Sequence, residues 1–395
     1  MSQALFGELS TQDFLNKHWQ QKPLLVRHAF ELPELSFDAG ELAGLACDTE
    51  APARIVIEHG EKPWQLKQGP FQETDFTSLP ATHWSLLIND IETYFPELNV
   101  FIEPFRFIPD WRIDDLMISY AADQGSVGPH VDDYDVFLIQ LDGIRRWSID
   151  ENPEFDSTAL EGPELKILKN PATTQSWELH PGDMLYLPPN MPHHGVAQGE
   201  CMTLSVGFRA PSSGELVQAW LDDIGDTAAF KVRFSDQQRE LQNNPGEITQ
   251  HDLKRLREIL IEGIEKSSGG LDIWLGKYLT ENKRPDPNIL EAMSEQFAEA
   301  FEEGESYQRF PGTRAAYTLN KNQIQLFVGG LEYSLDEKHI RAVEYLCREL
   351  EYEASAIATF CHDTEIRELI NTLINNNNIV LMEHSPCDYS KEPYS

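Results

Sequence analysis

The sequence predicts an α+β chain in three consecutive parts: a β-rich part over residues 1–211, a helical region over residues 212–281, and a mixed helix–strand domain over residues 286–395. Three observations favour this division. β-Branched and aromatic runs between glycine and proline turns fill the first part, leucine and isoleucine recur at helical spacing in the second, and helices alternate with short strands in the third. A chain of 395 residues is long enough for two or three hydrophobic cores.

The first part contains a predicted β-hairpin directly after the motif Gly128-Pro129-His130-Val131-Asp132. Residues 136–141 (VFLIQL) have the composition of a strand, and Asp142-Gly143 is typical of a tight turn. Residues 145–149 (RRWSI) then form the predicted returning strand. Alternate side chains of a strand share a face, so His130 and Asp132 can both point into one cavity.

A second histidine motif, Pro192-His193-His194-Gly195, follows a predicted turn, a short apolar strand and a proline-stiffened loop at residues 181–189. Together the two motifs supply a His-x-Asp pair and a distant histidine. Two imidazoles and one carboxylate suit Fe(II) with open coordination positions. The pattern therefore predicts an oxygen-activating enzyme rather than a metal store.

The same segments resemble a known family. Residues 128–147 (GPHVDDYDVFLIQLDGIRRW) and 181–195 (PGDMLYLPPNMPHHG) are similar to the two halves of a cupin-type JmjC oxygenase, whose core is a double-stranded β-helix. With residues 13–27 (DFLNKHWQQKPLLVR) and 205–211 (SVGFRAP), they resemble the bacterial ribosomal oxygenases that hydroxylate an arginine of large-subunit ribosomal protein sixteen. The resemblance is dense over residues 1–211 and thinner beyond.

The resemblance implies that His130, Asp132 and His193 are the catalytic Fe(II) ligands and that 2-oxoglutarate is the cosubstrate. It also implies that O2 is consumed and that succinate and CO2 are released. The family pattern Pro-His-x-Gly favours His193 as the third ligand, and His194 is the competing candidate because a one-residue shift of register would exchange them. Ligating imidazoles must be neutral, so metal binding is expected to weaken below about pH 6.5.

The distal carboxylate of 2-oxoglutarate needs a cation, and the arginine fork binds carboxylates through two parallel hydrogen bonds. Arg145 is the candidate, because related enzymes hold a basic residue at this place after the first motif. Strand alternation should turn one of Arg145 and Arg146 inward and the other toward solvent. Ser205 is a further cofactor-binding candidate through its hydroxyl, although a serine that only fills a strand face is an equal explanation.

An arginine substrate needs carboxylates and aromatic surface near the mouth of the pocket. Asp123 and Tyr134 are the candidate substrate contacts, and a solvated loop carboxylate is the alternative for Asp123. The chain has 31 Lys and Arg against 66 Asp and Glu, a formal net charge of −35. Such a field repels nucleic acid and attracts a very basic partner, such as an unassembled ribosomal protein. A generally acidic proteome would produce the same charge without a partner.

Two helices are predicted in the middle region. Ser212 and Glu215 form a predicted capping box at the start of the first, which has Trp220 on its apolar side. The second begins near Thr249, and its apolar residues recur at helical spacing until Ser267-Ser268-Gly269-Gly270: Leu253, Leu256, Leu260 and Ile264. Packing against the chain's own core is the simplest explanation of this region, whereas the family resemblance implies that it forms a homodimer.

Residues 282–287 have the composition of a linker, and the following domain resembles a winged helix. Ser334 and Glu337 predict the start of one helix, and a second apolar helical pattern precedes a strand at residues 379–382. The two helices should bury Ile340, Val343 and Leu346, and Ile366, Leu369, Ile370 and Leu373. Residues 286–395 carry 8 Lys and Arg against 20 Asp and Glu, so contact with nucleic-acid phosphates is not expected. A protein-facing or structural role is predicted instead.

Five scattered cysteines without CxxC spacing favour reduced thiols in a cytoplasmic protein, and no apolar run approaches the roughly eighteen residues of a membrane span. The leading hypothesis is hydroxylation of a ribosomal-protein arginine. The alternatives are the same chemistry on another protein residue, as histidine hydroxylation or lysine demethylation, and a non-catalytic metal-binding cupin that docks on a partner. A transcription factor is disfavoured by the acidic C-terminal part.

Overall fold

The computed structural model describes residues 5–48, 51–59, 63–237, 239, 241, 244, 246–281 and 304–382. The chain divides into two compact units. One comprises residues 1–210, 284–312 and 374–395, and the other comprises residues 211–283 and 313–373. The division at residue 211 coincides with the first predicted boundary, whereas the linker predicted at residues 282–287 lies outside the described residues. The division into three domains stays a prediction.

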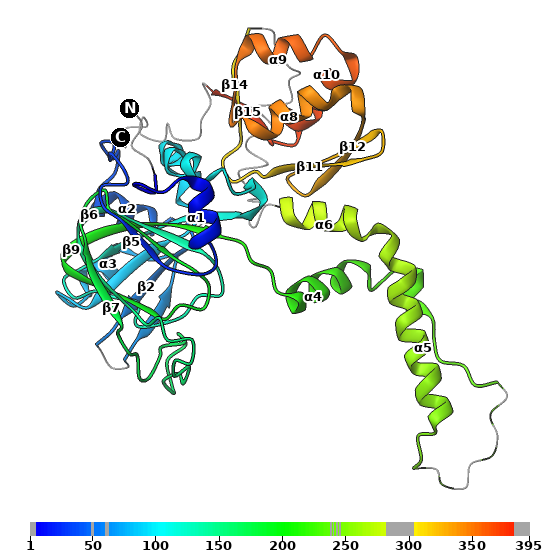
Figure 1. Ribbon diagram of the computed structural model, residues 1–395, viewed down its shortest axis with the longest axis horizontal. Coiled ribbons are helices and arrows are strands. Elements are labelled where there is room, and N and C mark those ends of the chain that lie inside the picture. Colours follow the sequence, from blue (N-terminus) through cyan, green and yellow to red (C-terminus); the bar gives the residue numbers. More distant parts are fainter. Residues whose placement is uncertain are drawn as a thin grey trace. The chain divides into compact units, whose positions relative to one another are not determined.

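A nine-stranded antiparallel sheet forms the framework of the first unit, and Figure 1 shows its strands curling around a shared interior. The strand order is β1-β8-β6-β9-β5-β4-β2-β3, and β7 also pairs with β6. The strands are β1 (Leu24–Val26), β2 (Ala53–Ile57), β3 (Gln65–Gln68), β4 (Trp84–Ile88), β5 (Ile113–Ala121), β6 (Val136–Ile149), β7 (Gln175–Leu179), β8 (Met184–Leu187) and β9 (His193–Phe208). The long strands β6 and β9 pair along most of their length, so they hold the two histidine motifs side by side.

The predicted hairpin at Asp142-Gly143 is wrong, because β6 runs through both residues as one strand. Its first half pairs with β8 and its second half pairs with β7, while β9 accompanies both halves. The register with β9 shifts on both sides of Asp142, and Gly143 has φ +65°. A glycine in the left-handed region is typical of a β-bulge that bends a strand. Gly143 therefore marks a bend in β6, not a turn between two strands.

The two faces of β6 pack against different clusters. Phe137, Ile139 and Leu141 belong to a large core that also contains Phe14 of α1 (Thr11–Lys17). Val136, Leu138, Trp147 and Ile149 lie in a second cluster on the opposite face, here called the inner face. A strand that is buried on both faces has a continuous apolar sequence, and residues 136–139 (VFLI) form one.

Short helices and 3-10 turns connect the strands of this unit. Ser10 caps α1 through the backbone N–H of Asp13, and Asp38 forms a capping box with Glu41 at the start of α2. The remaining elements before β5 are α2 (Ala39–Leu45), α3 (Glu73–Thr77), η1 (Ile91–Thr93), η2 (Pro96–Phe101), η3 (Glu103–Phe105) and η4 (Asp110–Arg112). Two short strands, β10 (Tyr307–Arg309) and β15 (Ile379–Leu381), pair with each other in an antiparallel ladder.

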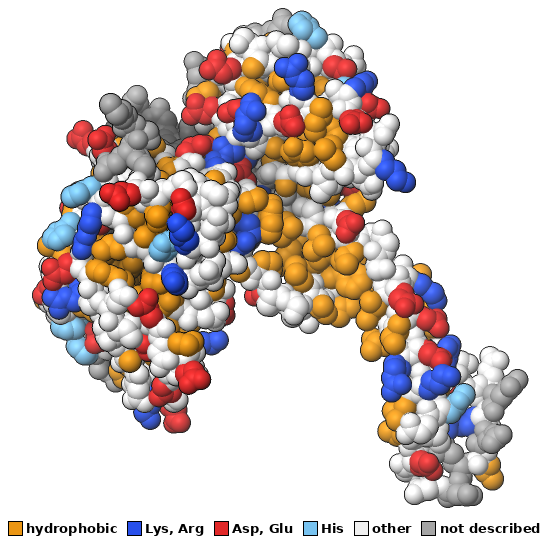
Figure 2. All heavy atoms as spheres, viewed as in Figure 1, with side chains coloured by type: hydrophobic (Ala, Val, Ile, Leu, Met, Phe, Trp, Pro, Cys, Tyr) orange, Lys and Arg blue, Asp and Glu red, His pale blue; other side chains and the backbone are white. Residues whose placement is uncertain are grey.

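The predicted middle helices are confirmed. Ser212 and Glu215 form the capping box of α4 (Ser213–Ile224), in which Trp220 is buried, and Thr249 caps α5 (Gln250–Ser267). The 3-10 turns η5 (Ala228–Lys231) and η6 (Ser268–Gly270) and helix α6 (Leu271–Thr280) complete this region. The expected packing of α5 against the chain's own core is wrong for its apolar stripe, which is 40–60% exposed: Leu253, Leu256, Leu260, Ile261 and Ile264. Figure 2 shows apolar side chains gathered on the surface of these helices.

The second unit also contains an antiparallel three-stranded sheet and a group of helices. The strands are β11 (Ala315–Asn320), β12 (Gln323–Val328) and β13 (Leu331–Asp336), and β14 (Glu351–Tyr352) is a short extra strand. The helical elements are η7 (Glu337–His339), α8 (Ile340–Arg348), α9 (Ala354–Phe360) and α10 (Thr364–Asn375). The predicted buried face of α10 is confirmed. The predicted cap at Ser334 is wrong: Ser334 lies in β13, and Asp336 caps the next turn through the N–H of Lys338.

Among the described residues, no helix has both the length and the apolar character that a membrane span requires.

We predict that Gly143→Ala destabilises the protein by about 3 kcal/mol or more, because a Cβ atom would lie 2.1 Å from the carbonyl oxygen of Glu200 in a backbone that is itself unfavourable for alanine. Gly199→Ala is the matched control, since Gly199 also has a positive φ (+75°) but no atom within 4 Å of the added Cβ. This substitution should lower the free energy of unfolding by only about 1 kcal/mol. Denaturant unfolding measures both, and equal losses would contradict a steric role for the bend.

Candidate metal centre

The structure brings His130, Asp132 and His193 together, although they come from segments about sixty residues apart. One ligand atom from each lies within 4.8 Å of the others. The Asp132 carboxylate lies 3.6 Å from His130 Nε2 and 3.5 Å from His193 Nε2. One ion at about 2.0–2.2 Å from each donor can bridge such a set.

Backbone pairing holds the two histidines in register. The N–H of His130 donates to the carbonyl of His193 at 3.0 Å, and the N–H of His193 donates to the carbonyl of His130 at 3.0 Å. This isolated antiparallel bridge joins His130, which lies shortly before β6, to His193, which is the first residue of β9. It places both side chains on one side of the pair, as directly opposed residues of an antiparallel ladder require.

Each imidazole is also oriented by a backbone carbonyl. His130 Nδ1 donates to the Gly128 carbonyl at 2.9 Å, and His193 Nδ1 donates to the Met191 carbonyl at 2.8 Å. A carbonyl only accepts, so in the neutral rings the proton is on Nδ1 and the lone pair on Nε2 faces Asp132. Ligating histidines commonly have this arrangement, with the second nitrogen bonded to a backbone or carboxylate oxygen.

His193 is 4% exposed, and its burial together with the neighbouring His130 lowers the pKa of its imidazole to about 4. His193 is therefore neutral at neutral pH, as a metal ligand must be. The competing residue His194 is the next residue on β9 and is not part of the cluster of three. Burial also lowers the pKa of His194 to about 4, and its Nε2 atom has no hydrogen-bond partner.

Arg145 lies on the inner face of β6, five per cent exposed, whereas Arg146 faces outward and binds Glu178 at 2.8 Å. Arg145 Nη1 donates to the hydroxyl of Ser119 on β5 at 3.1 Å. Its Nε and Nη2 atoms are buried without any hydrogen-bond partner. A buried guanidinium with unmatched donors is costly unless a ligand supplies an acceptor. The Arg145 side chain thus has the free donors that a carboxylate needs.

Ser205 lies on β9, six per cent exposed, opposite Met117 of β5 and Leu138 of β6. It therefore shares the inner face with Leu138, and alternation along β9 puts Thr203 on this face too. The Cα partner of Thr203 on β5 is Ser119, the residue that binds Arg145. The sequence did not single out Ser119, although a serine interrupting the apolar strand at residues 113–121 was the available signal.

The two tentative substrate contacts occupy different places. Asp123 accepts hydrogen bonds from the N–H of Gly199 at 2.7 Å and from Gln124, and these bonds lower the pKa of its carboxyl group. Gly199 is six residues beyond His193 on β9, about 20 Å along a strand. Asp123 thus has a structural partner, and the structure does not bring it to the metal cluster.

Tyr134 is 42% exposed, and the packing around its hydroxyl raises its pKa, with the nearby carboxylates of Asp132 and Asp115 adding to the shift. Asp115 is a buried carboxylate on β5 that the sequence analysis did not select. Asn89 donates to Asp115 Oδ2 at 2.7 Å, which orients it. The carboxylates of Asp132 and Asp115 thus both act electrostatically on the Tyr134 hydroxyl.

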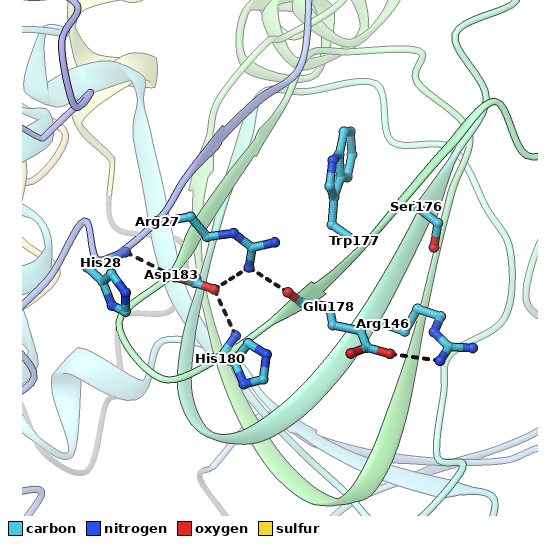
Figure 3. A pocket seen from close by; sticks show the side chains of 8 residues that line it. All are labelled: Arg27, His28, Arg146, Ser176, Trp177, Glu178, His180 and Asp183. Atoms are coloured by element: carbon cyan, nitrogen blue, oxygen red, sulfur yellow. Dashed lines mark hydrogen bonds and ion pairs between the residues drawn. The ribbon is translucent and has the colours of Figure 1, made fainter.

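A separate hollow of about 530 Å³ lies between the end of β1, strand β7 and the loop before β8 (Figure 3). Arg27 crosses it to bind Asp183 at 2.5 Å and the carbonyl of Glu178, and Arg146 pairs with the Glu178 side chain. None of the three clustered ligands lines this hollow. Its charged groups already neutralise one another.

Comparison with known proteins identifies two family domains and several relatives of this chain. A JmjC domain model matches residues 100–216, and a ROXA-like winged-helix model matches residues 271–378. The chain is 31% identical over 378 residues, 93% of this chain and 96% of the relative, to the ribosomal protein uL16 3-hydroxylase of Escherichia coli K12. It is 37% identical over 212 residues to a probable ribosomal oxygenase of Haemophilus influenzae, covering 53% of this chain and 52% of that protein.

Solved structures give the same result over the whole chain. The crystal structure of Escherichia coli YcfD superposes with a TM-score of 0.75 at 30% identity, covering 95% of this chain and 98% of that one. A YcfD complex with cobalt and 2-oxoglutarate superposes with a TM-score of 0.72 at 29% identity, covering 95% and 99%. The predicted JmjC and winged-helix folds are confirmed, and the winged-helix match begins at residue 271 rather than at the predicted 286.

We predict that His130→Ala, Asp132→Ala and His193→Ala each abolish binding of one equivalent of Co2+ at this centre, because each removes one of three donors. His194→Ala should retain that equivalent, since His194 lies outside the cluster. Isothermal titration of the metal-free protein measures both effects. Loss of binding in His194→Ala with binding retained in His193→Ala would show that the third ligand is His194.

Proposed function

This chain belongs to the JmjC-domain ribosomal oxygenases, and from that membership we propose that it is an Fe(II)- and 2-oxoglutarate-dependent hydroxylase of an arginine side chain in large-subunit ribosomal protein uL16. The observation that carries the proposal is the position of Arg145. Its two unpartnered nitrogens are buried on the inner face of the sheet whose strand β9 begins at His193, one of the three clustered residues.

His130, Asp132 and His193 would hold the iron. Two neutral imidazoles and one carboxylate leave coordination positions open, which suits Fe(II) in oxygenases. Iron held there supplies, with 2-oxoglutarate and O2, the oxidation of a C–H bond that no side chain can perform alone. The Gly128 and Met191 carbonyls keep both ligand rings in the neutral tautomer that leaves Nε2 free.

Arg145 would bind the distal carboxylate of 2-oxoglutarate. The Ser119 hydroxyl occupies one guanidinium nitrogen and fixes the side chain, which leaves Nε and Nη2 as donors. Parallel bonds from two such nitrogens match the two oxygens of a carboxylate. Ser205 lies on the same inner face and would add a hydroxyl. Because Arg145, Ser119 and Ser205 are buried, they would exclude water from the end of 2-oxoglutarate that lies away from the metal.

The substrate arginine would enter beside Tyr134 and Asp115. A guanidinium is attracted to an aromatic face and to a carboxylate, and the Tyr134 hydroxyl is within electrostatic range of both Asp115 and Asp132. Asp123 is the weaker candidate because its carboxylate already binds Gly199. The formal net charge of −35 favours encounter with a basic ribosomal protein and disfavours direct nucleic-acid binding. A cytoplasmic enzyme would meet this substrate before it assembles onto RNA.

The apolar stripe of α5 supports a homodimer. Leu256 and Leu260 are 48% and 60% exposed, and the stripe continues at Ile264. A contiguous exposed apolar patch on a helix is typical of a protein interface. A second copy of the same helix would bury such a stripe in a symmetric contact.

The direct test of the reaction uses purified protein with Fe(II), 2-oxoglutarate, O2 and uL16. We expect a one-oxygen mass gain on one arginine and an equal amount of succinate, and no gain when that arginine is replaced by lysine. Peptides with histidine or methyl-lysine test the alternative residues. Metal binding without 2-oxoglutarate turnover on any substrate would favour the non-catalytic docking module.

We predict that Arg145→Ala raises the KM for 2-oxoglutarate at least about 30-fold, because the distal carboxylate loses its buried charge partner, a loss of about 2 kcal/mol or more. Co2+ binding should be unchanged, because Arg145 is not a ligand. Arg146→Ala is the matched control, since its side chain faces outward on the next residue. Unchanged kinetics in Arg145→Ala would assign the carboxylate to another residue.

We predict that the double variant Leu256→Glu, Leu260→Glu is monomeric in sedimentation at micromolar concentration, where the unchanged protein is a dimer, because buried carboxylates would oppose the contact. Lys254→Glu is the control. Lys254 lies on the same helix, but its side chain is 74% exposed, so this variant should remain dimeric. A monomeric mass for the unchanged protein would overturn the proposed dimer.

A further inference from the structure

A second cluster of potential metal ligands lies at the end of the β2–β4 ladder. Glu58, His59 and His83 each offer one ligand atom, and these atoms lie within 4.8 Å of one another. His59 Nε2 lies 3.6 Å from Glu58 Oε1, and the two imidazole rings have their centroids 4.5 Å apart. Donors around a tetrahedral Zn2+ at about 2.0–2.1 Å are separated by about 3.3–3.5 Å, so the spacing fits a single ion.

The backbone at this cluster is well defined by the sheet. β2 and β4 end at the pair Ile57 and Trp84, and the N–H of Glu58 extends the ladder by donating to the carbonyl of His83 at 2.9 Å. This hydrogen bond at the end of the ladder holds the backbones of Glu58 and His83 side by side. His59 follows directly and completes the set.

His83 is held in an unusual conformation. It has φ +66°, and its N–H donates to the carbonyl of Asp123 at 2.9 Å while its own carbonyl accepts from Glu58. The hydroxyl of Thr82 lies 2.8 Å from His83 Nδ1. A hydrogen-bond partner on one ring nitrogen is the contact that orients a ligating imidazole. The side chain is therefore directed by its backbone and by a polar neighbour.

This cluster is separate from the centre formed by His130, Asp132 and His193, with which it shares no residue. It lies next to Asp123, whose carboxylate binds Gly199, about 20 Å along β9 from His193. The His59 side chain is 66% exposed and that of Glu58 is 24% exposed, so an ion would reach the cluster from solvent and keep water in its remaining position.

We propose that Glu58, His59 and His83 form a second metal site that takes a divalent ion of the zinc class. Two imidazoles and one carboxylate with an open position is a donor set that Zn2+ accepts. An ordinary ion pair explains Glu58 and His59 but does not use His83. In a chain of net charge −35 the surrounding field also favours cations. A bound ion would brace the end of the β2–β4 ladder against the segment that starts at Asp123.

The test is Zn2+ stoichiometry of the full-length, metal-stripped protein, measured by calorimetry and by metal analysis after desalting. We expect two equivalents per chain for the unchanged protein and one for His59→Ala, a change at an exposed residue. His83→Asn should also bind one, because asparagine tolerates the left-handed backbone and the fold is kept. The variant His130→Ala, His193→Ala should retain the second equivalent, and Zn2+ should raise its Tm.

His251→Ala is the matched control, since His251 is an exposed histidine outside the cluster, and it should bind two equivalents. His59→Ala should hydroxylate at the unchanged rate with iron supplied, which distinguishes this site from the catalytic centre. One equivalent in the unchanged protein, or two equivalents retained in His59→Ala, would overturn the proposal. Neither result would bear on the proposed hydroxylase activity.

Discussion

The reciprocal pair of backbone hydrogen bonds between His130 and His193 is the constraint on which the candidate metal centre depends. It joins the start of β9 to the segment before β6, and it brings two imidazoles to the same carboxylate. Two further backbone carbonyls orient those imidazoles. Four hydrogen bonds to backbone atoms thus position the two histidine ligands, so their geometry is a property of the sheet rather than of flexible side chains. This is the form of preorganisation that a metal centre requires.

The inner face of the sheet combines this centre with a cation that has spare donors. Trp147, Leu138 and Leu185 make most of that face apolar, which raises the cost of the two unpartnered nitrogens of Arg145. A dicarboxylate bound to the metal at one end and to Arg145 at the other would offset this cost. The folded chain therefore has two buried hydrogen-bond donors on Arg145 without acceptors. The distal carboxylate of the cosubstrate would supply those acceptors.

Much of this could be predicted from local patterns. The capping box at Ser212, the helix start near Thr249 and the strand alternation that turns Arg145 inward follow from local rules, and they hold. The predictions that failed depend on distant partners. Gly143 has the sequence of a turn, but it bends a continuous strand because β9 pairs on both sides of it. Ser119 is recognised only from its hydrogen bond to Arg145, and Asp115 only from its burial on β5. The exposure of the α5 stripe likewise could not be read from its periodicity.

The central claim is that this centre oxidises an arginine of one ribosomal protein. Intact masses of all ribosomal proteins from cells with and without the gene test it most directly. We expect a one-oxygen gain confined to uL16, present only in cells that carry the gene and lost when the gene encodes His193→Ala. Identical masses for every ribosomal protein in the two cell lines would contradict the ribosomal substrate and send the search for a substrate to other proteins.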